Sequence, residues 1–175
     1  MEVFLDFEAS SLSDDSYPIE VGWVFADGRT ETHLIRPARL WTDWDADAER
    51  IHGITRERLL AEGELHDAVA ERMMQALAGH DIYVTAPSWD GKWLSVLLRA
   101  AGLPRHGLRV KDSDLALSAA ARQALGPGAG KRALEARIAE ARDRLSEEPV
   151  EHRALADAQQ ERRLWLEIRT PDHPR

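Results

Sequence analysis

The amino-acid sequence predicts a single α/β domain built around a mixed sheet. Short apolar runs come first, helical patterns are interleaved with them, and helical patterns alone fill the last third of the chain. The 175 residues, 43% of them apolar, suffice for one domain with an ordinary buried core. No internal repeat or low-complexity linker is present, so we expect one domain at residues 1–170 and a frayed tail at 171–175.

Five segments are expected to form strands, because they are short, apolar and rich in β-branched or aromatic residues. They are residues 3–7, 19–26, 30–35, 82–85 and 108–110. Asp27-Gly28 separates the second segment from the third and is typical of a hairpin turn. Pro87 closes the fourth segment, because proline cannot donate a hydrogen bond within a sheet.

Helical patterns occur between the strands and throughout the last third of the chain. Apolar residues recur with the helical period in residues 65–77 and 90–101, and Gly102 is placed to end the second helix. From residue 114 to 168 the composition shifts to Ala, Arg, Glu and Leu. A Gly-Pro-Gly sequence and Pro149 break this stretch, which therefore predicts three helices.

In two parts of the C-terminal third, the sequence raises the question of which residues are exposed and which are buried. Residues 131–148 are rich in charge and are typical of a solvated helix face. Leu164, Trp165 and Ile168 on the last helix fit either the core or an interface between two copies of the chain. A homodimer is therefore an open possibility at this point.

Composition and charge exclude several classes of protein. The absence of cysteine excludes disulfides, thiolate nucleophiles and cysteine-ligated metals. The acidic N-terminus does not fit a signal peptide, and no apolar run reaches the roughly 18 to 20 residues that cross a bilayer. We therefore expect a cytoplasmic protein without a membrane partner. The formal net charge of −8 counts against tight binding of long double-stranded nucleic acid. It fits binding of a short strand or a carboxylate-lined metal site.

Asp6 and Glu8 lie two residues apart at the end of the first expected strand. Side chains alternate across a strand, so both carboxylates point to one face and can hold a metal ion together. Acids are also common where a strand emerges into water, and Asp-x-Glu alone is a weak pattern. The neighbouring Phe4, Leu5 and Phe7 make the strand look central, where two acids cost energy unless a positive group compensates them.

Two further candidate sites lie near expected helix starts. Asp90 follows the fourth strand, where it also fits an N-cap that accepts the free amides of the first turn. His152 and Asp157 are five residues apart, and five helical residues turn about 140° beyond a full circle. Both side chains therefore face one site only if His152 lies in the loop before the helix. Taken singly, each of these residues is more often a surface residue than a functional one.

Three motifs stand in a defined order along the chain. They are Asp6-x-Glu8, Asp90 and His152-x-x-x-x-Asp157. Together they resemble the DnaQ-like, or DEDD-type, 3′–5′ exonuclease family in its histidine-containing branch, over nearly the whole chain. Residues 10–12 and 51–55 lie where that family places supporting segments. The second of these segments also fits a tight turn, with Gly53 supplying the backbone freedom.

The resemblance implies an RNase H-like fold with a mixed five-stranded sheet flanked by helices. It implies a metal-dependent enzyme that releases 5′-mononucleotides from single-stranded DNA or RNA. Two Mg²⁺ or Mn²⁺ ions would be held by Asp6, Glu8, Asp90 and Asp157, with Asp6 bridging both. Hard carboxylates suit these cations, which together supply a nucleophile and compensate phosphoryl charge. His152 would be the general base, because imidazole titrates near neutral pH.

The same resemblance implies a partner, namely a single strand or a short oligonucleotide with a free 3′ end. The residues implied in substrate binding are Ala9, Ser10, Ser11, Leu12, His52 and Trp89. Leu12 would lie against the terminal base, and His52 would contact the terminal sugar or base. Trp89 and Trp93 flank the second motif, where they can stack on bases, although core packing explains them better.

The chain departs from the family pattern at two places. Ala86 and Thr85 stand where the second motif commonly has Asn and often His, and Ser10-Ser11 replace the more usual Thr-Gly. None of the five proposed catalytic groups is lost, so we expect an active enzyme with an unusual substrate preference. Two alternatives stay open: a nucleic-acid or nucleotide binding module without turnover, and a small-nucleotide phosphodiesterase.

Overall fold

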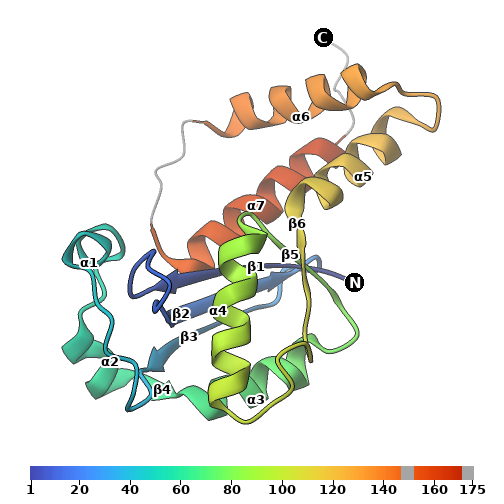
Figure 1. The fold of residues 1–175 in the computed structure, drawn as a ribbon. Coiled ribbons are helices and arrows are strands. Elements are labelled where there is room, and N and C mark those ends of the chain that lie inside the picture. Colours follow the sequence, from blue (N-terminus) through green and yellow to red (C-terminus); the bar gives the residue numbers. More distant parts are fainter. Residues whose placement is uncertain (147–151, 171–175) are drawn as a thin grey trace.

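The computed structural model describes residues 1–146 and 152–170 and is built around a six-stranded mixed sheet (Figure 1). The strands are β1 (Glu2–Ala9), β2 (Pro18–Phe25), β3 (Thr30–Arg36), β4 (Glu64–Leu65), β5 (Asp81–Val84) and β6 (Val110–Asp112). Their order across the sheet is β4-β3-β2-β1-β5-β6. Because β1 pairs antiparallel with β2 and parallel with β5, it lies in the middle of the sheet.

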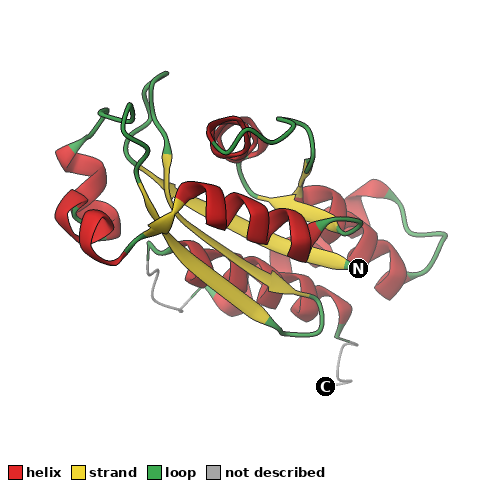
Figure 2. Cartoon of the chain, turned by 90° about the horizontal axis from the view of Figure 1, so that it is seen from below, coloured by secondary structure: helices red, strands yellow, loops and turns green. Residues whose placement is uncertain are grey.

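Seven helices surround the sheet in the described part of the chain. They are α1 (Ala46–His52), α2 (Arg56–Glu62), α3 (His66–Leu77), α4 (Pro87–Ala100), α5 (Ser113–Leu125), α6 (Lys131–Leu145) and α7 (Ala154–Arg169). Helices α3 and α4 cover one face of the sheet, and α5 and α7 cover the other (Figures 1 and 2). Helix α6 packs on α5 and α7 from outside.

Strand β1 shows why the core has two sides. Its residues Val3, Leu5 and Phe7 are buried against α3 and α4. Phe4 points to the opposite face, where its ring lies 5.7 Å from that of Trp165 on α7. Both faces of the strand are therefore covered, and the even-numbered positions of β1 all look toward α7.

Most of the expected elements are present, with shifted ends. The five expected strands and the three helices of the C-terminal third are confirmed, and Leu164, Trp165 and Ile168 belong to the core. The sixth strand, β4, adds two residues beside β3. The last expected strand lies at Val110–Asp112 and not at 108–110. Pro149 and the expected frayed tail at 171–175 lie outside the described residues.

Two short helices, α1 and α2, were not expected from the sequence. Each has seven residues, too few for an apolar period to be recognised. Their ends carry clear signals, because Asp45 and Thr55 accept amide hydrogen bonds at the two N-caps. Gly53 ends α1 with a φ of 67°, so the expected turn there is confirmed as the join between two helices.

No helix within residues 1–146 and 152–170 combines the length and the apolar character that a membrane span needs. Helix α7 has its apolar residues on the side that faces the sheet, among them Ala158, Leu164 and Ile168. Its burial is therefore that of an amphipathic helix packed on a sheet.

Gly22 on β2 lies directly beneath the first turn of α7. A Cβ atom at this position would lie 2.3 Å from the backbone nitrogen of Leu155 and 2.7 Å from the carbonyl carbon of Ala154. These neighbours are backbone atoms, which cannot rotate aside as a side chain can. Gly22 therefore allows helix and sheet to approach more closely than any other residue would.

The substitution Gly22→Ala is expected to destabilise the protein by ~1–3 kcal/mol, because overpacking displaces the first turn of α7. Urea unfolding monitored by circular dichroism measures this change. Gly91→Ala in α4 is the matched control, because its Cβ would meet only Val110 Cγ2 at an ordinary 3.5 Å. That control should be neutral or stabilising, since alanine favours a helix interior. Equal stability of the two variants would contradict the close approach of α7.

Candidate active site

Asp6 and Glu8 project from β1 on the face that α7 covers. In the antiparallel pairing with β2, Asp6 lies opposite Gly22 and Glu8 lies opposite Glu20. The expected shared face of Asp6 and Glu8 follows from the alternation of side chains along a strand. Strand β1 thus presents two acids close together, and β2 adds a third beside them.

Helix α7 brings Asp157 to these strand acids. Carboxylate oxygens of Asp6, Glu8 and Asp157 all lie within 4.8 Å of one another. Asp157 belongs to the first turn of α7, where its backbone N–H donates to the carbonyl oxygen of Arg153 at 3.0 Å. Three of the four carboxylates expected to bind metal are therefore gathered in one cluster, hereafter the carboxylate cluster.

Asp90 is buried next to this cluster but lies outside the group within 4.8 Å. Helix α4 begins at Pro87, three residues earlier than expected, so Asp90 is not the N-cap of the helix. Its Oδ2 accepts a hydrogen bond from the backbone N–H of Ala86 at 3.2 Å. Asp90 thus bonds back to the residue that precedes the helix, and this bond holds its carboxylate in place.

Burial and crowding of negative charge shift the proton affinities of these acids. Burial, and then the charges of Asp90, Glu8 and Asp157, raise the pKa of Asp6 to about 9. Burial raises the pKa of Glu8 and that of Asp90 to about 7 each. The pKa of Asp157 is also raised by burial, which outweighs the opposing effect of His152. Bound cations would relieve this repulsion, since they stabilise the charged carboxylates.

His152 lies outside helix α7, as expected for a residue that must share a site with Asp157. The helix begins at Ala154, and the His152 side chain is exposed. The imidazole is close enough to oppose the raised pKa of Asp157.

Glu20 is a buried acid of the same site that was not singled out from the sequence. Its side chain is 2% exposed, and it forms an ion pair with Arg153. Its charge contributes to the raised pKa values of Asp6, Glu8 and Asp157. The sequence contains one signal for it, because an acid within the apolar run 18–25 is costly unless it is paired.

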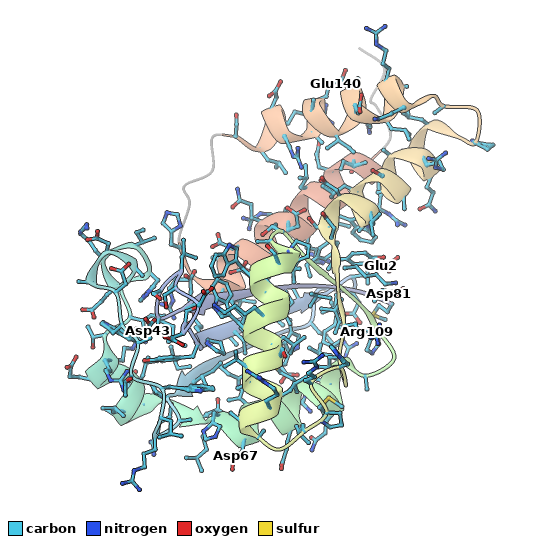
Figure 3. The ribbon with its side chains drawn as sticks, in the orientation of Figure 1. Glu2, Asp43, Asp67, Asp81, Arg109 and Glu140 are labelled. Atoms are coloured by element: carbon cyan, nitrogen blue, oxygen red, sulfur yellow. The ribbon has the colours of Figure 1, made fainter. Side chains whose placement is uncertain are left out.

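Three serine hydroxyls in the segment that follows β1 converge on Asp43. Ser10 and Ser11 donate to Asp43 Oδ2 at 3.0 and 2.5 Å, and Ser13 donates to Asp43 Oδ1 at 2.9 Å. In Figure 3, Asp43 lies at the opposite end of the sheet from Glu2 and Asp81. The hydroxyls of Ser10 and Ser11 are thus used inside the protein, and Leu12 is the exposed residue among the four expected to bind substrate in this segment.

His52 ends helix α1 and is 6% exposed. Its Nδ1 accepts a hydrogen bond from the backbone N–H of Ile54 at 3.1 Å, which leaves Nε2 to carry the proton. Within the described residues this Nε2 is buried without a hydrogen-bond partner. Burial lowers the pKa of His52, so the ring is a neutral donor at physiological pH.

The two tryptophans of α4 have different surroundings. Trp93 is buried, and its Nε1 donates to Ser16 Oγ at 3.0 Å, so the expected core role is confirmed for it. Trp89 is half-buried and stacks on Trp93 with 5.6 Å between ring centroids. Lys92 Nζ lies 4.9 Å from the Trp89 ring. Trp89 thus stacks on Trp93 and has the ammonium group of Lys92 over its ring.

A cavity of about 400 Å³ opens beside Asp6 and Asp157. Its described walls are Asp6, Thr85, Arg142, Leu145, Ser146, Asp157, Gln160, Glu161 and Leu164. Sites for small molecules commonly have volumes of about 300–1,000 Å³. The carboxylate cluster is therefore reachable from a cavity of useful size, with both polar and apolar walls.

Solved structures of exonuclease I resemble this chain over almost its full length. E. coli exonuclease I in complex with a dT13 oligonucleotide superposes with a TM-score of 0.64 and 18% identity, covering 92% of this chain. Exonuclease I from Methylocaldum szegediense gives a TM-score of 0.68 and 17% identity, covering 93%. The chain thus has the RNase H-like fold of these solved structures. A mixed sheet with helices on both faces is thus confirmed as the fold class.

The similarity is one of fold, and it covers only part of each exonuclease I chain. This chain spans about two fifths of the length of each of these exonucleases, 39% in both cases. No protein-family model matches the sequence, and no curated protein matches it either. Function must therefore be argued from the side chains of the site.

The carboxylate cluster fits a divalent cation. Its donors are hard oxygen atoms within 4.8 Å of one another, the kind that Mg²⁺ and Mn²⁺ prefer. Their raised pKa values show that the folded chain holds these charges at a cost. A cation would offset this cost, so Asp6, Glu8 and Asp157 are the residues that would hold it.

Without metal, the stability of the protein should fall as pH rises from about 6 to 9. Asp6 has a pKa of about 9 in the folded chain and 3.8 ordinarily, so the folded state holds more protons in this range. One such proton changes the free energy of unfolding by up to ~1.4 kcal/mol per pH unit. Thermal unfolding in EDTA at several pH values measures the slope.

Asp6→Asn removes this titration and should flatten the slope, leaving the variant more stable than the wild type at pH 9. Asp67→Asn, at an exposed acid of α3, is the control and should keep the wild-type slope. Added Mn²⁺ should stabilise the wild type at high pH and have little effect on Asp6→Asn. An unchanged slope in Asp6→Asn would show that Asp6 is already charged in the folded state.

Proposed function

We propose that this chain is a divalent-metal-dependent 3′–5′ exonuclease that acts on single-stranded nucleic acid. One observation supports the proposal most strongly: Asp6, Glu8 and Asp157 gather within 4.8 Å inside an exonuclease fold. The neighbouring exonuclease I structures include complexes with dT13 oligonucleotides, which supports a single strand as the substrate.

Two Mg²⁺ or Mn²⁺ ions are the proposed cofactors. Asp6, Glu8 and Asp157 would hold them, and Asp90 would contribute from the start of α4. Bound there, the ions supply a metal-activated water and neutralise charge on the phosphoryl oxygens. The oxygens of the cluster are charged only when their protons have left, so metal binding should release protons.

His152 is the proposed general base. It is exposed and precedes α7, so its ring can turn toward a water molecule beside Asp157. A neutral imidazole nitrogen would accept the proton of the water that attacks the phosphorus. Attack breaks the bond to the 3′ oxygen of the preceding nucleotide and releases a 5′-mononucleotide.

The terminal nucleotide is proposed to bind between the segment after β1 and the end of α1. The hydroxyls of Ser10 and Ser11 are committed to Asp43, so this segment would offer its backbone and the exposed Leu12 side chain. His52 Nε2 is a buried donor without a partner in the described chain, and it suits an oxygen of the terminal nucleotide. The half-buried Trp89 can stack on a base.

Digestion of a 3′-labelled single strand with Mn²⁺ should release 5′-mononucleotides, and EDTA should abolish their release. Asp6→Asn should lower kcat more than ~100-fold, since even outer partners of metal ligands are worth 10–100-fold. His152→Ala should lower kcat by ~10²–10⁴-fold, the usual contribution of a general base. Asp67→Asn is the control at an exposed acid and should retain full activity.

The same digestion separates the alternatives. Binding of the strand without cleavage at saturating Mn²⁺ would indicate a binding module, for which Ala86 in the second motif is the motivation. Cleavage of dinucleotides but not of longer strands would indicate a small-nucleotide phosphodiesterase. Parallel DNA and RNA strands determine which sugar is preferred.

Leu12→Ala should raise KM about 10-fold for a strand with a free 3′ end while leaving kcat within about twofold. Leu12 is 68% exposed, so its truncation removes a contact with the terminal base at little cost in stability. Leu115→Ala on α5, where the side chain is 60% exposed, is the matched control. A strand blocked by a 3′-phosphate should be a poor substrate for all three proteins. An unchanged KM in Leu12→Ala would place the terminal nucleotide elsewhere.

A further inference from the structure

Glu20 is a buried carboxylate beside the cluster, and both of its oxygens accept hydrogen bonds from the protein itself. Its Oε2 accepts from Arg153 Nε at 3.0 Å, and its Oε1 accepts from Arg153 Nε at 3.2 Å and from Nη2. Oε2 also accepts from the backbone N–H of Ala154 at 3.1 Å. Glu20 is close enough to raise the pKa of three neighbouring acids, yet it is not in the group within 4.8 Å.

The hydrogen bond to Ala154 gives α7 a cap that its own sequence lacks. Arg153 is the N-cap residue, and its side chain makes no capping hydrogen bond. Asp, Asn, Ser or Thr would normally fill this position. Glu20 supplies the missing acceptor from β2, 134 residues away in the chain, and places a negative charge at the positive end of the helix.

In the sequence, Arg153 lies between His152 and Asp157, the two residues of the third motif. His152 immediately precedes Arg153, and Asp157 lies in the turn that Ala154 begins. On β2, Glu20 lies opposite Glu8 in the strand pairing. One buried contact thus ties the start of α7 to β2, the strand paired with β1, which carries Asp6 and Glu8.

We propose that Glu20 and Arg153 form a positioning pair, which sets Asp157 and His152 in place relative to Asp6 and Glu8. The effect of this pair on kcat rests on the proposed exonuclease function. The placement of the first turn of α7 by the pair does not. Glu20 acts through Arg153 and the Ala154 amide, and it is not a ligand of the cation. Close packing at Gly22 limits how near α7 can come, while the Glu20 contact fixes where its first turn begins.

Glu20→Gln tests the pair with little change of volume, because glutamine keeps one acceptor and loses the charge. It should lower kcat about 10–100-fold and leave KM within about threefold, since the terminal nucleotide binds elsewhere. Mn²⁺ affinity should fall about 10-fold. Arg153→Met should behave alike, and the double variant should be no worse than either single variant, because both remove one contact.

Hydrogen exchange of the metal-free protein supplies a readout that does not need activity. Amides at residues 154–158 should exchange at least 10-fold faster in Glu20→Gln, while those of α3 should keep the wild-type rate. Glu31→Gln is the matched control, because Glu31 accepts two hydrogen bonds from Arg72 on α3 at 2.8 and 2.5 Å. It breaks a similar ion pair between a strand and a helix and should alter neither kcat nor the exchange of residues 154–158.

The outcomes separate this inference from the proposed function. If the wild type does not cleave any strand, the proposed exonuclease function is rejected. If Glu20→Gln nevertheless shows faster amide exchange and weaker Mn²⁺ binding, the positioning pair is supported. Unchanged exchange and Mn²⁺ affinity in Glu20→Gln would overturn the pair, whether or not the chain cleaves. Losses in Glu20→Gln no larger than those in Glu31→Gln would also overturn it, since they would reflect general destabilisation.

Discussion

The site depends on the close approach of helix α7 to strand β2. At Gly22 the helix backbone occupies the space that any side chain would fill, with Leu155 nitrogen 2.3 Å from where a Cβ would be. Asp6 is the strand partner of Gly22 on β1, so the missing side chain lies next to the carboxylate that Asp157 must reach. Without that approach, the acids of β1 and α7 would be separate surface charges.

This geometry concentrates negative charge, and the positive and N–H groups of the protein compensate only part of that charge. Glu20 is neutralised by Arg153 and by a helix amide, and Asp90 accepts the amide of Ala86. The three acids of the carboxylate cluster have raised pKa values, because burial and mutual repulsion disfavour their charged forms. Folding therefore creates a site that is unfavourable when fully charged, and uptake of a cation in exchange for protons would offset that cost.

Local periodicity predicted the parts of the site that lie on one element. The spacing of Asp6 and Glu8 gave their shared face, and the arc of a helix required His152 to precede α7. Contacts between segments that are distant in the sequence could not be predicted from local periodicity. Asp43 holds serines about 30 residues away, and Glu20 holds Arg153 across 133 residues, so neither partner has a local signature.

Element ends were harder to predict than element types, for reasons visible in the chain. Helices α1 and α2 are short, and their stability comes from caps and from packing of Ile54 and Leu59 beneath them. Pro87 was expected to close a strand, but β5 already ends at Val84, and Pro87 is the first residue of α4, a position that proline favours.

Ala86 stands where the exonuclease family that the motifs resemble commonly has asparagine, and the surroundings of Ala86 show what this difference means. Ala86 is the N-cap of α4 and contributes no capping side chain, yet the helix start is held by Pro87 and by the bond from the Ala86 amide to Asp90. The second motif therefore keeps its backbone without the amide side chain. A nucleic-acid strand bound as proposed would meet a methyl group and the Thr85 hydroxyl here. The departure should therefore alter how substrate is held more than how the acids are arranged.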